Sequence, residues 1–137
     1  MIIFIRVIIM KLIVCLDDNN GMMFNKRRQS RDRVLIENMI ELCKDEKLYT
    51  NEYSVSLFPE NAVEIFDNIE DVEKSYCFAE NFTVNEEYVD EIIVYKWNRV
   101  YPADTHFNID LGNWTLTESV DFEGSSHEKI TREIYRR

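Results

Sequence analysis

The chain has 137 residues, of which 45 % are hydrophobic and 31 % charged, and its formal net charge is −10. This length suits one domain with a sizeable core, and the low content of three glycines and two prolines argues against a disordered chain. The acidic balance disfavours binding to nucleic acid or to an anionic membrane through overall charge, although a local basic patch can overrule that average.

The N-terminal region, residues 1–16, is almost entirely apolar, with interruptions at Arg6 and Lys11. A membrane span needs about 20 apolar residues, and a secretory signal needs a small-residue cleavage site, so neither is predicted. Met10 begins a strand-like segment that leads directly into Asp17. We therefore expect residues 1–9 to be a mis-assigned start or a frayed extension, residues 10–137 to form the single domain, and the protein to be cytoplasmic.

The first half of the chain predicts strands and one helix. Residues 11–16 form an apolar run typical of a central strand, and residues 17–21 have turn chemistry. Ser30 is the expected cap of a helix that runs to about Cys43 and has one apolar face. Residues 47–58 look extended, and residues 61–66 favour a short helix.

The second half predicts mainly strands. Residues 75–79 and 91–97 favour strands, and residues 85–91 favour a short acidic helix. Residues 114–122 and 128–135 alternate apolar and polar side chains, which is typical of an antiparallel pair. The alternation of strands and helices with a hairpin-like end predicts an α/β fold with a mostly parallel sheet and one antiparallel edge.

Three segments carry a resemblance to a known family. Residues 17–25, D-D-N-N-G-M-M-F-N, are similar to the D-E-N-N-G-I-G-x-N segment of dihydrofolate reductases. Residues 89–94 resemble the V-D-K-L-Y-L strand of that family. Residues 104–107, D-T-H-F, followed by Trp114 and a final I-Y-R-R, resemble its C-terminal end. The resemblance implies a reduced dihydrofolate reductase-like three-layer sandwich, with a mostly parallel central sheet and an antiparallel C-terminal edge.

The sequence departs from this family where its chemistry resides. The position of the catalytic acid falls at Leu35, which cannot deliver a proton, and the phosphate-binding G-R-K-T turn is replaced by N-E-Y-S at residues 51–54. The glycine pair that lets backbone approach a pyrophosphate is replaced within residues 78–81, F-A-E-N. The resemblance thus implies a truncated, degenerate member that lacks the motifs for NADPH and the catalytic acid, so no cofactor is predicted.

One basic cluster stands out in this acidic chain. Residues 26–33 contain Lys26, Arg27, Arg28, Arg31 and Arg33 against a single acid, Asp32. Guanidinium groups beside the backbone donors of a helix start suit an anion. The alternative is a solvated face that pairs with the chain's own carboxylates or contacts an acidic partner. Asp32 is the one weak candidate for a substituting catalytic acid, with a solvated ion pair to its neighbouring arginines as the alternative.

The remaining chemical residues favour structural roles. Thr105 matches a threonine at a strand end in the family, and here we expect it to order the backbone. His106 is expected to be exposed, and His127, which follows two serines, has no evident orienting acid for nucleophilic catalysis. The aromatic residues between Tyr95 and Trp114 favour core and edge packing over stacking on a base or pterin.

Cysteine and histidine counts limit the metal chemistry. Cys15, Cys43 and Cys77 are odd in number and have no C-x-x-C spacing, so neither a disulfide framework nor a zinc site is predicted, and we expect buried thiols in a reducing cytosol. Two histidines cannot supply the two-zinc cluster of a metal-dependent ribonuclease.

The sequence therefore predicts a small cytoplasmic protein without reductase activity that binds an anionic ligand: a nucleotide, a phosphorylated metabolite or RNA. The expected ligand-binding residues are Asn20, Asn25, Lys26, Arg27, Arg28, Arg31, Arg33 and Thr105. One alternative is an NADPH-dependent pterin or flavin-type reductase in which Asp32 or a bound water delivers the proton. Another is an RNA-acting protein that uses the basic segment. A sheet edge left open by missing strands would be available for a homodimer.

Overall fold

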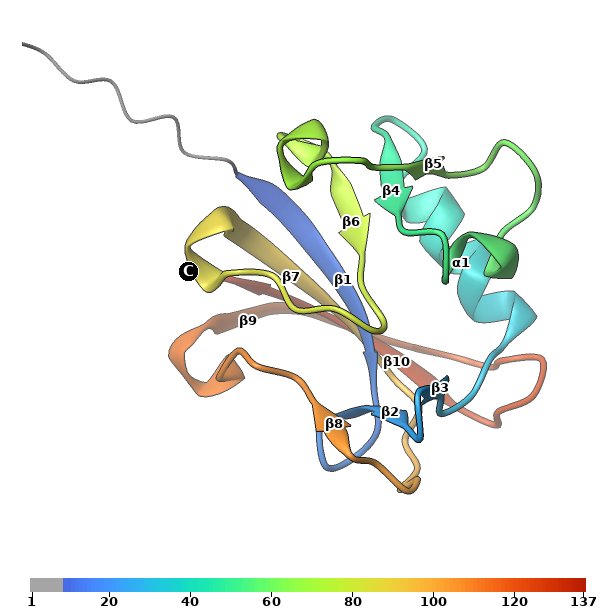
Figure 1. The fold of residues 1–137 in the computed structure, drawn as a ribbon. Coiled ribbons are helices and arrows are strands. Elements are labelled where there is room, and N and C mark those ends of the chain that lie inside the picture. The colour runs from blue at the N-terminus through green and yellow to red at the C-terminus, as the bar shows by residue number, and fades with distance from the viewer. Residues whose placement is uncertain (1–8) are drawn as a thin grey trace, which may run out of the picture.

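The computed structural model describes residues 9–137 and has a seven-stranded sheet at its centre (Figure 1). The strand order is β5-β4-β6-β1-β7-β10-β9. The bounds are β1 Met10–Leu16, β4 Leu48–Thr50, β5 Glu64–Ile65, β6 Tyr76–Phe78, β7 Val89–Lys96, β9 Thr115–Phe122 and β10 Ile130–Arg136. The pairs from β5 to β7 are parallel, and β10 is antiparallel to both β7 and β9. The predicted α/β class, with a mostly parallel sheet and an antiparallel C-terminal edge, is confirmed.

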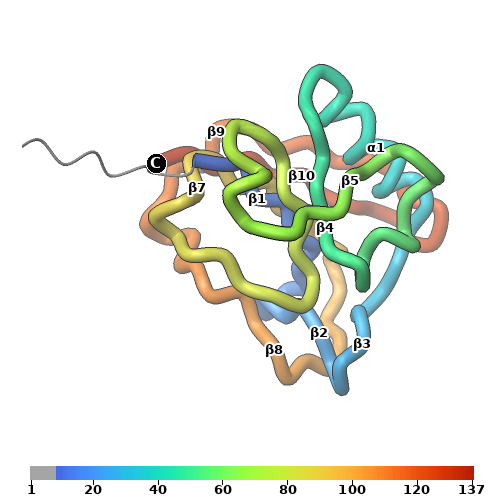
Figure 2. Tube along the Cα trace, turned by 45° about the horizontal axis from the view of Figure 1, so that its top comes forward, coloured from blue at the N-terminus to red at the C-terminus, as the bar shows by residue number. Residues whose placement is uncertain are grey.

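A smaller sheet lies beyond the carboxyl end of β1. It consists of β2 (Gly21–Phe24), β3 (Arg27–Arg28) and β8 (Thr105–His106), with β2 in the middle, and it is at the bottom of both ribbon and tube views (Figures 1 and 2). The turn between β2 and β3 is tight because Asn25 and Lys26 both have a positive φ, 51° and 61°. Two successive residues of that conformation match the twist of a hairpin.

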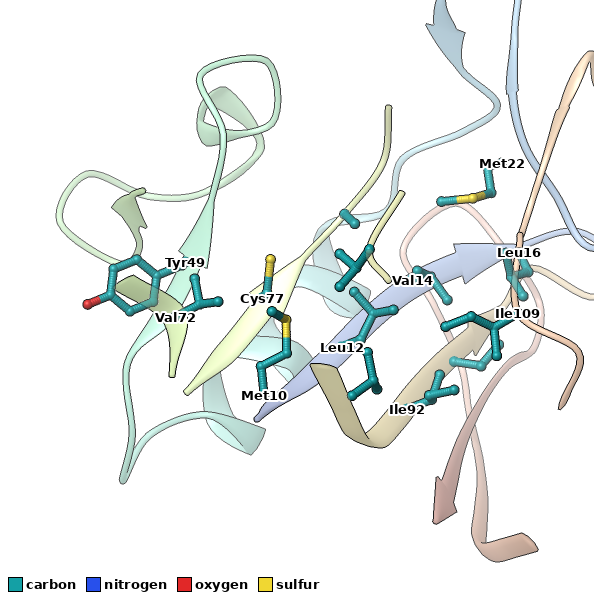
Figure 3. Packing of buried hydrophobic residues seen from close by; sticks show 14 of the residues in the cluster. Met10, Leu12, Val14, Leu16, Met22, Tyr49, Val72, Cys77, Ile92 and Ile109 are labelled. Carbon is teal, nitrogen blue, oxygen red and sulfur yellow. The ribbon is translucent and has the colours of Figure 1, made fainter. Parts of the chain in front are cut away.

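Strand β1 has two buried faces. Met10, Leu12, Val14 and Leu16 belong to one core cluster, whereas Ile13 belongs to the other. Alternate side chains of a strand point to opposite faces, so an unbroken apolar run is what a doubly covered strand requires. On the first face, β1 packs with residues of loops and short elements such as Met22, Val72 and Ile109 (Figure 3).

The second face of the sheet is covered by the one α-helix found among residues 9–137, α1 (Arg33–Leu42). Leu35, Ile36 and Met39 are its buried residues. The sequence predicted Ser30 as the helix cap, and this was wrong. Asp32 is the N-cap, because its Oδ1 atom accepts hydrogen bonds from the backbone N–H groups of Val34 and Leu35 at 3.0 and 3.1 Å.

Three other predicted elements differ from the structure. Residues 47–58 are extended only in β4, and they then form a 3₁₀ turn at Val55–Leu57. Residues 61–66 contain the short strand β5 instead of a helix, because Tyr49 and Thr50 of β4 pair with them. The acidic helix expected at residues 85–91 is a single 3₁₀ turn at Glu86–Tyr88 that leads into β7. Two further 3₁₀ turns lie at Ile69–Val72 and Leu111–Asn113.

The ends and edges of the fold are simple. The expected N-terminal extension lies outside the described residues except for Ile9, whose carbonyl accepts a hydrogen bond from Lys74 N–H at 2.7 Å. Strands β5 and β9 form the edges of the large sheet. Within residues 9–137 there is no helix with the length and apolar character needed to cross a bilayer.

Candidate functional site

Residues 28–32, which join β3 to α1, contact three separate parts of the fold. In open α/β sheets, ligands bind in the crevice beyond the carboxyl ends of the parallel strands. This segment crosses that edge: Arg28 reaches the residues after β6, Gln29 reaches the end of β1, and Ser30 and Asp32 reach the loop between β9 and β10. The candidate site is therefore organised by five consecutive residues.

Arg28 contacts residues that follow β4 and β6. Its Nε and Nη2 atoms each lie 3.0 Å from a carboxylate oxygen of Glu80, which is 8 % exposed. The guanidinium stacks over the Tyr53 ring, 4.7 Å from its centroid, and Ser54 Oγ donates a hydrogen bond to Glu80 at 2.6 Å. Hydrogen bonding to Glu80 raises the pKa of Arg28. A bidentate ion pair thus links β3 to the residues that follow β6, next to a cavity that Tyr53 and Asn81 line.

Asp17 holds together the turn that follows β1. Its Oδ1 atom accepts hydrogen bonds from the backbone N–H groups of Asn19 and Gly21, at 2.9 and 2.7 Å. Its Oδ2 atom accepts from Gln29 Nε2 and from Tyr101 N–H, both at 3.1 Å. Burial alone would raise the pKa of Asp17, but these hydrogen bonds outweigh it and lower the pKa. The residue is an ionised structural anchor beside the candidate site.

Asp32 is buried against the loop between β9 and β10, which corrects the expectation of a solvated ion pair. The residue is only 3 % exposed. Its carboxylate accepts hydrogen bonds from the backbone N–H groups of Ser125 and Ser126 at 2.9 and 2.7 Å, and it lies 3.0 Å from His127 Nδ1. Fixed donors satisfy the charge better than the flanking arginines could, because those side chains remain in solvent.

The ionised form of Asp32 is favoured by these contacts. Burial by itself would raise the pKa of this carboxyl group. The hydrogen bonds from His127 and from the backbone of Ser125, Ser126 and Leu35 overcome that effect and hold the pKa well below its usual range. Asp32 is thus a carboxylate that accepts hydrogen bonds, and it is a poor source of protons.

His127 has the orienting acid that the sequence did not reveal. Its Nδ1 atom faces Asp32, while its Nε2 atom lies 3.1 Å from both Ser30 Oγ and Tyr101 Oη. The imidazole stacks on Trp97, with 4.6 Å between ring centroids and an interplanar angle of 28°. The expectation that His127 lacks such an acid was therefore wrong. The acid was missed because Asp32 lies 95 positions earlier in the sequence.

The start of α1 offers no free backbone donors, contrary to the expectation of a helix-start anion site. The N–H groups of Val34 and Leu35 donate to the Asp32 side chain, and that of Ile36 donates to the Asp32 carbonyl. The Arg33 N–H donates to Ser125 Oγ at 3.0 Å. Any anion bound in this region would have to rely on side-chain cations.

The predicted basic residues fall into two groups. Arg33 pairs with Glu37 on the surface, as the solvated-face alternative anticipated, whereas Arg28 pairs with the buried Glu80. Lys26, Arg27 and Arg31 are exposed, and no acidic partner is found for them among residues 9–137. Three separate cavities adjoin the cluster: about 280 Å³ beside Arg27, about 600 Å³ beside Lys26 and about 500 Å³ beside Arg31.

The other predicted ligand-binding residues shape the surrounding turns. Asn20 has a φ of 59°, and its carbonyl accepts a hydrogen bond from Phe107 N–H. Asn25 N–H donates to Asp104 Oδ2 at 3.0 Å and lines the cavity beside Arg27. Thr105 is exposed in β8 and lines the cavity beside Lys26. Their part in ligand binding stays a prediction.

Leu35, where the resemblance places the catalytic acid, lies in the core and is 1 % exposed. His106 is exposed, as predicted. Trp97 and Trp114 are buried in the two core clusters, which confirms the expected packing role of the aromatic residues. No local pattern in the sequence indicates that His127 contacts Asp32. The nearest signal is the pair of serines before His127, whose backbone N–H groups also bind Asp32.

The cysteines are free, and burial disfavours their reactive thiolate form. Burial raises the pKa of Cys43 and of Cys77 to about 12, and it raises that of Cys15 well above the usual value. Across the part of the chain that the structure describes, no group of three or more His, Cys, Asp or Glu side chains could hold a metal ion.

Comparison with solved structures identifies the fold. The chain superimposes on a dihydrofolate reductase from Enterococcus faecalis, solved in complex with NADP(H) and RAB-propyl, with a TM-score of 0.65 and 12 % sequence identity. The match covers 94 % of this chain and 96 % of that one. No protein-family model matches the sequence, and no curated protein matches it. At this identity the likeness concerns the fold alone, and it confirms the predicted dihydrofolate reductase-like fold.

Proposed function

We propose that this chain, which has a dihydrofolate reductase-like fold, is a cytoplasmic binding protein for a phosphate-bearing anion and has no reductase activity. The observation that carries this proposal is the trio Lys26, Arg27 and Arg31. These cations are exposed and lack acidic partners among the described residues, although the chain carries a formal charge of −10. Unpaired cations in an acidic protein provide a local electrostatic site for an anion.

Two features support the absence of reductase activity. Leu35, where the resemblance places the catalytic acid, is buried in the core and cannot deliver a proton. Asp32, the substitute considered from the sequence, is held ionised by its hydrogen bonds. A reductase would need each of these features to rearrange.

The cavities next to the cations suit a small ligand. Lys26 shares a cavity of about 600 Å³ with Tyr53 and Asn81, which offer a ring face and an amide to a nucleotide. Arg27 lines the cavity of about 280 Å³ with Phe24 and Gln29. A phosphate held by the cations, with the rest of the ligand in the neighbouring cavity, is the arrangement that we propose.

The test is calorimetric titration of the protein with GTP, inorganic phosphate, NADPH, folate and a short single-stranded RNA. We expect saturable binding of GTP or RNA that weakens as salt rises, since phosphate contacts release counterions. Arg27→Ala combined with Arg31→Ala should reduce the affinity about tenfold or more. Lys44→Ala is the matched control, because Lys44 is an exposed cation that pairs with Glu41 away from the site.

The outcomes separate the alternatives. Saturable folate binding, or NADPH binding that the arginine double variant retains, would contradict the proposal and favour the reductase alternative. RNA binding without GTP binding, lost in the arginine double variant, would favour the RNA-acting alternative. Equal anion binding by the double variant and wild type would show that the cations do not form the site.

The proposed homodimer would use an open edge of the large sheet. The edge strand β9 is exposed along most of its length and includes the apolar Leu116 and Val120, 48 % and 40 % exposed. Edge strands with unpaired backbone groups are templates for pairing with another chain. Light scattering tests this directly: a dimeric mass that falls to a monomeric mass for Val120→Lys supports it, and a monomeric wild type contradicts it.

A further inference from the structure

The contacts of Ser30, His127 and Asp32 form a chain of the kind that activates a serine nucleophile. Ser30 Oγ lies 3.1 Å from His127 Nε2, and His127 Nδ1 lies 3.0 Å from Asp32 Oδ2. We propose that Ser30 is the nucleophile of an acyl-transfer site that cleaves small carboxylic esters. Nucleophilic serines are recognised by this geometry and by the roles of the three groups, whatever their order in the sequence.

The order of the three groups sets the imidazole tautomer. Asp32 also accepts hydrogen bonds from the backbone N–H groups of Ser125 and Ser126, so its carboxylate is fixed and acts as an acceptor. The imidazole therefore donates its Nδ1 proton to Asp32 and presents the Nε2 lone pair to the hydroxyl groups of Ser30 and Tyr101, which both lie 3.1 Å away. Stacking on Trp97 holds the ring plane, and His127 is 5 % exposed. The base is positioned before any substrate arrives.

The surroundings provide a donor, and a cavity adjoins the residues that follow Ser30. Tyr101 Oη lies 3.1 Å from His127 Nε2, so it stands beside the base and can donate a hydrogen bond to a developing oxyanion. Arg31 and Asp32, which follow Ser30, line the cavity of about 500 Å³ between α1 and the turn at Val55–Leu57. Ile36, Ile40 and Phe58 give it an apolar wall. An ester with an apolar acyl group fits this chemistry.

The reaction balances without any further reagent. Ser30 Oγ attacks the ester carbonyl carbon while its proton moves to His127 Nε2, and Tyr101 donates to the carbonyl oxygen as it becomes negative. The C–O bond to the alcohol then breaks, and the alcohol leaves with the proton from Nε2. Water attacks the acyl-serine in the same way, with His127 first accepting and then returning the proton, and a carboxylic acid is released.

The test combines a covalent probe with an ester assay on the full chain. We expect a fluorophosphonate probe to label Ser30, identified by mass spectrometry of the peptide, and we expect 4-nitrophenyl butyrate to be hydrolysed faster than the acetate. Ser30→Ala should abolish labelling and lower kcat/KM about 100-fold or more. Ser119→Ala is the matched control, because Ser119 is an exposed serine of β9 that lies outside the proposed site.

Asp32 is a positioning residue, and a separate measurement tests that role. Asn is also a good helix cap, so Asp32→Asn keeps the helix start but removes the preference for the required tautomer. We expect the variant to remain folded by circular dichroism, to lose labelling of Ser30, and to have a lower kcat while KM stays near the wild-type value. Labelling at other residues, or unchanged hydrolysis by folded Ser30→Ala, overturns the proposal.

Discussion

Asp32 and His127 are joined by a contact of 3.0 Å between Oδ2 and Nδ1, although 95 positions separate them in the sequence. Asp32 is at the same time the N-cap of α1, so one carboxylate links the start of the only α-helix in the described chain to the loop between β9 and β10. The loop contacts Asp32 through the backbone N–H groups of Ser125 and Ser126 and through the His127 imidazole. A change at either residue is therefore expected to affect both the helix and the loop.

The stability of the fold should fall at low pH because of Asp32. The pKa of Asp32 is lower in the folded protein than in the unfolded chain. Its contribution to stability is therefore complete above the unfolded pKa and is lost as pH falls from that value towards the folded pKa. We expect the free energy of unfolding in urea to drop by about 2 kcal/mol more in wild type than in Asp32→Asn between about pH 5 and pH 2. Asp90→Asn, at an exposed position of β7, should keep the wild-type profile.

The Arg28–Glu80 pair should show strong coupling in a double-mutant cycle. Removing one partner leaves a shielded charge unpaired, so Arg28→Met and Glu80→Gln are each expected to cost about 3 kcal/mol of unfolding free energy. The double variant should cost at least about 1 kcal/mol less than their sum. The exposed pair Arg33–Glu37 should show coupling below about 0.5 kcal/mol. Equal coupling in the two cycles would contradict the shielded environment of the Arg28–Glu80 pair.

Gly124 is expected to tolerate no side chain. A Cβ atom there would lie 2.8 Å from Ile130 Cδ1 and 2.9 Å from Asp32 Cγ, and closer still to Asp32 Oδ2. Crowding of this kind costs about 1–3 kcal/mol, so Gly124→Ala should lower the melting temperature and disturb the contacts of Asp32. Gly112→Ala is the control, since Gly112 is exposed and its nearest neighbour would be an aspartate oxygen at 3.0 Å. A melting temperature for Gly124→Ala equal to that of wild type would contradict this account.

Thr50 should stabilise the pairing of β4 and β6 through its hydroxyl. The residue is fully buried, and its Oγ1 atom donates to the Phe78 carbonyl at 2.9 Å. Thr50→Val keeps the shape but removes the donor, so we expect a loss of about 1–2 kcal/mol in chemical denaturation. Thr117 lies on the exposed strand β9 and donates a similar hydrogen bond to the Ile134 carbonyl of β10. Thr117→Val should cost less unfolding free energy than Thr50→Val, because water can replace the donor there.

The sequence by itself determined the strands whose patterns are local. The apolar run of β1 requires cover on both faces, and the alternating residues of β9 and β10 require an antiparallel pair at an edge. The segment at residues 17–25 and the C-terminal pattern indicated the fold that the structural comparison confirms. Short elements such as β5 were mispredicted because two residues carry little pattern, and pairing with β4 decides their state.

Only the tertiary structure decided which polar groups meet. Arg28 and Glu80 are 52 positions apart, and Ser30 and His127 are 97 positions apart, so no spacing in the sequence relates them. In the sequence, residues 26–33 form one basic cluster. In the fold, Arg28 and Arg33 pair with acids, whereas no acidic partner is found among the described residues for Lys26, Arg27 and Arg31. The physical reason is that burial and strand order bring particular donors and acceptors together, whereas local patterns report only which face of an element is apolar.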